Sequence, residues 1–113
     1  MGFFEWGGKR FARGVSKSMA HSYESFRNRY PNLTEHELVL RTLSTRPGDP
    51  AKTLCSDIEN EDSFNKLGGN LSGITYILLQ MEYLKDIGGT VEDLETLNPI
   101  FKSVLAEVMP TQY

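Results

Sequence analysis

The sequence predicts an all-α protein, with about five helices in a compact irregular bundle around a buried fourth helix at residues 71–87. Apolar residues recur at helical spacing through most of the chain, and helix start and stop signals separate these stretches. No segment alternates apolar and polar residues in the manner of a half-buried strand. The 113 residues, 39% hydrophobic and 24% charged, suffice for one domain with one core.

The first expected helix runs from about Lys9 to Asn28 and is amphipathic. At ~100° per residue its apolar side chains share an arc of about 120°, with most of the cations on the opposite side. Pro31 is expected to stop it. Residues 1–8 are interpreted as a separate aromatic N-terminal segment, because Gly7-Gly8 would loosen a helix that continued through them. Residues 9–113 then form a single helical domain.

The next three helices follow from capping signals and apolar patterns. Thr34 and Glu37 have the spacing of a capping box, which begins the second helix. Asp49 is expected to cap the third helix, with Pro50 at its first position. The fourth, at residues 71–87, is apolar on nearly all sides, which is typical of a buried helix.

The last helical stretch begins at Thr90 and keeps a helical apolar period to Val108. Asn98-Pro99 is expected to divide it into a short helix and a longer one, because a proline disfavours the helical conformation of the residue before it. Pro110 is expected to end it.

Charge is unevenly distributed along the chain. The first thirty residues carry six Lys or Arg against two Glu, and the other eighty-three carry six against thirteen Asp or Glu, so the balances of +4 and −7 sum to −3. A segment of this kind often meets an oppositely charged surface, which can belong to a membrane, to a partner or to the protein's own domain. Trp6 and Phe3 would also fall outside the apolar arc of the first helix if it were extended backwards. The predicted contact surface comprises Phe3, Phe4, Trp6, Lys9, Arg10, Phe11, Arg13 and Lys17.

The favoured hypothesis is a small non-enzymatic interaction protein, such as an accessory subunit, adaptor or inhibitor, that contacts a protein partner through this surface. The alternative is peripheral association with an anionic membrane, since rings and cations also suit lipid headgroups. A weaker alternative is an enzyme or small-ligand binder with an interhelical pocket, for which Tyr76 and Tyr83 offer polar groups. Homo-oligomerisation stays open, and the acidic bulk of the chain disfavours binding to nucleic acid.

Motifs for metal binding, cofactors and catalysis are absent from the sequence. His21 and His36 have no histidine at helical spacing, and His36 is expected to be exposed in the first turn of the second helix. The acidic stretch 57–62 does not match an EF-hand loop. Cys55 is the only cysteine, which favours a cytoplasmic location, with a place at the membrane periphery as the alternative. We therefore expect no cofactor, no metal and no catalytic residue.

Overall fold

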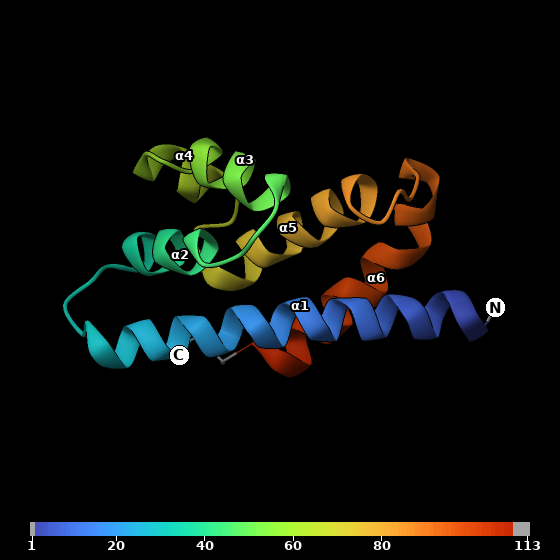
Figure 1. Ribbon diagram of the computed structural model, residues 1–113, viewed down its shortest axis with the longest axis horizontal. Coiled ribbons are helices and arrows are strands. Elements are labelled where there is room, and N and C mark those ends of the chain that lie inside the picture. Colours follow the sequence, from blue (N-terminus) through green and yellow to red (C-terminus); the bar gives the residue numbers. More distant parts are fainter. Residues whose placement is uncertain (1, 110–113) are drawn as a thin grey trace.

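The computed structural model describes residues 2–109, with side chains from residue 5 onward. Six helices and no strand make up these residues, which confirms the all-α prediction (Figure 1). The elements are α1 (Gly2–Arg29), α2 (Glu35–Ser44), α3 (Asp49–Asp57), α4 (Glu61–Lys66), α5 (Leu71–Lys85) and α6 (Val91–Val108).

The helices are arranged around α5, which contacts α1, α2, α3 and α6 (Figure 1). Helices α1 and α6 lie on one side of the molecule, and α3 and α4 lie on the other. The 28 residues of α1 extend about 42 Å at ~1.5 Å per residue, close to the molecule's longest dimension of 45 Å. The predicted buried helix is thus confirmed as α5, although it ends at Lys85 and not at Ile87.

The apolar face of α1 is part of the core. Ala12, Val15, Met19 and Tyr23 are spaced three or four residues apart, and each is at most 4% exposed. They join buried residues from the other helices, of which Phe101 of α6 is the largest fully buried one. Burial of each large apolar side chain contributes roughly 1.5–3 kcal/mol. The amphipathic pattern of the first helix therefore serves the protein's own core.

Helix α1 begins at Gly2, not near Lys9, and runs through Gly7 and Gly8 without a break. Gly8 is buried against α6, and a Cβ atom at this position would lie 2.5 Å from Cδ2 of Leu97. The physical reason for this glycine is therefore the close approach of two helices and not flexibility. The expected start of the helix is corrected, while the division into residues 1–8 and 9–113 stays a prediction.

Helix α6 is continuous, whereas the sequence predicted two helices separated at Asn98-Pro99. Pro99 has no N–H and cannot donate to the Glu95 carbonyl one turn earlier. Both residues lie on the exposed side of α6, so this carbonyl can accept a hydrogen bond from water. Leu97 and Phe101 on either side of the proline are buried. Packing before and after Pro99 thus holds the two halves in one helix.

Capping interactions define several helix ends. The Thr34 hydroxyl accepts from the Glu37 backbone N–H and the Glu37 carboxylate accepts from the Thr34 N–H, which confirms the predicted capping box. Helix α3 is capped by Gly48, with φ of 106°, and not by Asp49, which lies within the first turn. The predicted end of the last helix at Pro110 lies outside the described residues.

Candidate functional site

The exposed face of α1 near its start carries one aromatic and four cationic side chains. Trp6, Arg10, Arg13 and Lys17 follow one another at spacings of three or four residues, with Lys9 beside them. All five side chains are exposed, Trp6 to 58%. The Arg10 guanidinium lies 5.2 Å from the centroid of the Trp6 ring, a cation–π contact that contributes about 0.5–1 kcal/mol at an exposed site. We call these five residues the basic-aromatic stripe.

The position of the stripe is fixed by the buried side of the same helix. Gly8 packs against Leu97 only two residues after Trp6, and Ala12 and Val15 continue the buried side past the cations. Because α1 is one helix through this region, these contacts also determine which way Trp6 and Arg10 face.

Most of the positive charge of the stripe has no partner in the described part of the chain. Arg13 is the exception, since its Nη2 donates to Glu107 Oε1 and Oε2 of α6 at 3.3 and 3.1 Å. Both side chains are about half exposed, so this pair contributes at most about 1 kcal/mol. Lys9, Arg10 and Lys17 form no ion pair with any described carboxylate. Their charges are therefore available to an external anionic surface.

Three of the predicted contact residues are not part of the stripe. Phe3 and Phe4 lie within α1, but outside the residues whose side chains are described. Phe11 is partly buried, with its ring centroid 6.3 Å from that of Tyr83 and 6.0 Å from that of Phe101. Its helical phase turns it toward the core and away from the cations, and the place of Phe11 on the contact surface stays a prediction.

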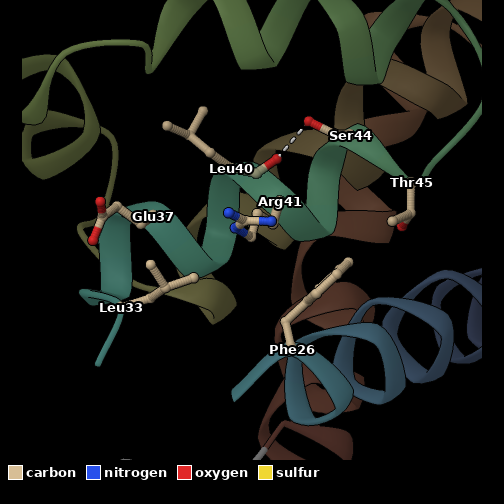
Figure 2. Close-up of a pocket in the computed structure, with 7 residues that line it drawn as sticks. All are labelled: Phe26, Leu33, Glu37, Leu40, Arg41, Ser44 and Thr45. Atoms are coloured by element: carbon tan, nitrogen blue, oxygen red, sulfur yellow. Dashed lines mark hydrogen bonds between the residues drawn. The ribbon is translucent and has the colours of Figure 1, made fainter. Parts of the chain in front are cut away.

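A second exposed surface lies at the opposite end of α1. Tyr30 is 37% exposed, its ring is stacked on Phe26 with centroids 6.4 Å apart, and the Arg41 guanidinium lies 4.7 Å from its centroid. Next to it, an open groove of about 510 Å³ runs between the end of α1 and α2 (Figure 2). The groove is lined by Phe26, Leu33, Glu37, Leu40, Arg41, Ser44 and Thr45.

The two tyrosines that were expected beside an interhelical pocket do not line this groove. The Tyr83 hydroxyl donates to Asp93 Oδ2 at 2.9 Å, and burial, followed by this hydrogen bond, raises the pKa of Tyr83. The Lys102 ammonium lies 5.5 Å from the centroid of the Tyr76 ring. Both rings thus make contacts between α5 and α6.

Two carboxylates, one buried and one partly buried, escaped the sequence analysis, because their partners lie far away in the chain. The guanidinium of Arg46 donates to Glu82 through Nε and Nη2, at 2.5 and 2.9 Å, and Glu82 is only 4% exposed. Glu35 accepts from the Tyr23 hydroxyl and from the Leu71 N–H, the latter at 3.1 Å, at the start of α5. Each carboxylate is held by donors from other elements, so both serve the fold.

His36 and Cys55 both lie partly buried in the fold. His36 is not exposed as predicted, because its Nε2–H donates to the Ile58 carbonyl at 2.6 Å and its ring lies tilted against Phe64, with centroids 4.7 Å apart. Burial raises the pKa of the Cys55 thiol, which keeps it protonated at neutral pH. No three His, Cys, Asp or Glu side chains in the described range are placed to share a metal ion. Nor is any helix of residues 2–109 long and apolar enough to cross a membrane.

The described structure therefore presents two exposed surfaces on α1, one at each end. The basic-aromatic stripe combines an accessible indole with unpaired cations, which suits it to bind an acidic surface. The groove combines apolar side chains with one acid and one base. Comparisons of this chain with protein-family models, with curated proteins and with solved structures found no match.

Proposed function

We propose that this protein is a small non-enzymatic interaction protein, an accessory subunit, adaptor or inhibitor, that binds an acidic surface of a partner protein through its basic-aromatic stripe. The observation that supports this most directly is Trp6, 58% exposed and held beneath Arg10 at the head of a line of cations. Trp and Arg are the residues that most often dominate the binding energy of protein interfaces. An indole that enters a pocket of the partner would supply affinity, and the cations would select an acidic surface around it.

The charge distribution of the chain supports the same proposal. The first thirty residues have a balance of +4 and the remainder −7, yet Lys9, Arg10 and Lys17 are not neutralised by any described carboxylate. Exposed charges of one sign speed the encounter with a surface of the other sign. The proposal includes a cytoplasmic location, which agrees with a single free cysteine.

Peripheral membrane association through the same stripe is the alternative proposal. An interfacial helix needs an apolar face that can enter the lipid boundary, but Ala12, Val15 and Met19 of α1 are enclosed in the core. The described part of the stripe offers lipid only Trp6 and four cations. Each cation would contribute about 1 kcal/mol near an anionic surface. The shortage of free apolar surface among the described side chains of α1 favours the protein partner.

Affinity capture from the host lysate tests the proposal. The baits are the wild-type protein, Trp6→Ala, a variant with all four stripe cations changed to Gln, and Ile87→Ala as the control. Ile87 is exposed to 58%, as Trp6 is, but it follows α5 and belongs neither to the stripe nor to the groove. We expect the wild type and the control to retain the same partner, Trp6→Ala to lower its affinity about 30-fold, and the Gln variant to remove most of the salt dependence.

Two results separate the alternatives. A partner that binds all four baits with equal affinity would refute a role for the stripe. Sedimentation with vesicles of phosphatidylserine and of phosphatidylcholine tests the membrane alternative, which requires binding to the anionic vesicles alone and its loss in the Gln variant.

A further inference from the structure

The groove between α1 and α2 is an apolar surface that the described chain leaves uncovered. Phe26, Leu33 and Leu40 pack against the core on one side and are partly exposed on the other, and Tyr30 adds exposed ring surface at the edge. Figure 2 shows Phe26 reaching from α1 toward α2, with Arg41 projecting from α2 beside it. Apolar surface that gathers side chains from two elements is typical of an association site.

The charges of the groove balance each other. Glu37 and Arg41 are its only charged lining residues, and they stand one helical turn apart on the outer side of α2. No ion pair within the described chain joins either of them to an opposite charge. A partner with strong net charge would therefore gain nothing here. A surface with one carboxylate and one cation in the reverse order along its axis would form an ion pair with Arg41 and another with Glu37.

A second copy of this chain carries such a surface. If two α2 helices pack antiparallel about a two-fold axis level with Val39, Glu37 of each copy faces Arg41 of the other. The same register sets Leu33 opposite the smaller Thr45 and brings the two Leu40 side chains together near the axis. One arrangement thus pairs the two charges, sets a large side chain opposite a smaller one, and covers apolar surface on both copies.

We infer that the groove between α1 and α2 is the interface of a two-fold dimer of this chain, in which Glu37 of each copy pairs with Arg41 of the other. This interface lies at the opposite end of α1 from the basic-aromatic stripe, so each copy in the dimer keeps its stripe exposed (Figure 1). The inference is independent of the function proposed for the stripe.

Sedimentation equilibrium over a series of protein concentrations tests the dimer. We expect the wild type to dimerise reversibly and Arg41→Glu to weaken dimerisation at least about tenfold, because two acidic side chains then face each other. Arg41 is exposed and makes no capping contact, so this variant should fold. Lys66→Glu makes the same change of charge on α4, outside the groove, and should dimerise like the wild type.

A mixing experiment tests the pairing itself. The Glu37→Arg and Arg41→Glu variants should each dimerise at least about tenfold more weakly than the wild type, but an equal mixture should form a heterodimer in which both charge pairs are restored. Circular dichroism checks the helix content of Glu37→Arg, which loses the carboxylate that accepts from Thr34 N–H. A wild type that stays monomeric at every concentration would overturn the inference. A dimer that tolerates Arg41→Glu would overturn it as well.

Discussion

A matched pair of glycine substitutions in α1 tests whether the start of this helix is docked on α6. Gly8 and Gly14 both lie within α1, six residues apart. A Cβ at Gly14 would meet no atom within 4 Å, whereas one at Gly8 would lie 2.5 Å from Leu97 Cδ2. The two substitutions to Ala therefore share the same gain in helix propensity and differ in the contact with α6.

The expected magnitudes follow from these distances. Ala is favoured over Gly inside a helix by about 1 kcal/mol, so Gly14→Ala should raise the free energy of unfolding by that amount. Carbon atoms pack ~3.5–4.0 Å apart, so the new methyl group at position 8 overlaps Leu97 by more than about 1 Å. Leu97 is 1% exposed and can move only by displacing its neighbours. Overpacking of this kind costs about 1–3 kcal/mol, which should leave Gly8→Ala that much less stable than Gly14→Ala.

Urea unfolding followed by circular dichroism measures both variants, and a double-mutant cycle with Leu97→Ala isolates the contact. With Leu97 shortened, Gly8→Ala should become stabilising by about 1 kcal/mol, like Gly14→Ala. If Gly8→Ala stabilises the wild-type background as much as Gly14→Ala does, the first turns of α1 are not docked, and residues 1–8 form a separate segment as the sequence suggested.

Three further predictions concern buried and capping groups. Arg46→Ala leaves Glu82 buried without its cation and should destabilise by about 3 kcal/mol in urea titrations, whereas Arg46→Met with Glu82→Leu should stay near wild type. Thr75→Val should stabilise by about 1 kcal/mol in thermal unfolding, because the buried Thr75 hydroxyl has no hydrogen-bond partner among the described residues; no gain would contradict this. Hydrogen bonds from the Thr34 backbone and hydroxyl lower the pKa of Glu37 from its ordinary value of 4.5. The ionised Glu37 carboxylate therefore contributes to the stability of the fold above that pH, and this contribution is lost as pH falls through the lower pKa of the folded state. Melting curves of Glu37→Gln should accordingly lose less stability on acidification than those of wild type.

A helix end could be predicted from the sequence where the capping hydrogen bonds that form it join residues within one turn. The capping box of Thr34 and Glu37 is such a case, and Thr90 forms a second box with Asp93. Gly8 and Pro99 could not be predicted in this way. Both have unfavourable local propensity for a helix, and both are held in one by contacts between elements that are distant in sequence.

The sequence predicted only those features of the candidate site that depend on the position of a residue around the axis of α1. Trp6 falls outside the apolar arc of α1, and the structure shows it exposed. Phe11 belongs to the apolar arc of the helix and packs partly against the core, so its place on the contact surface stays a prediction. The groove could not be predicted, because it exists only once the end of α1 packs beside α2. Leu33, just before α2, and Leu40 within it were the apolar residues that the sequence offered as a signal.

The separation of opposite charges in this fold supports the proposal that the stripe binds a partner and does not hold the fold together. The carboxylates of the densest acidic stretch, residues 57–62, are exposed at the corner of α3 and α4 and form no ion pair with described residues. Helix α2 lies between this corner and α1, and the stripe lies toward the far end of α1 (Figure 1). Exposed charges further apart than the ~10 Å screening length at 0.1 M salt hardly attract each other. Had the cations been required by the fold, more of them would have partners like that of Arg13 on Glu107. Instead, one cation of the stripe, Arg13, pairs with α6, and the other three face outward together with Trp6.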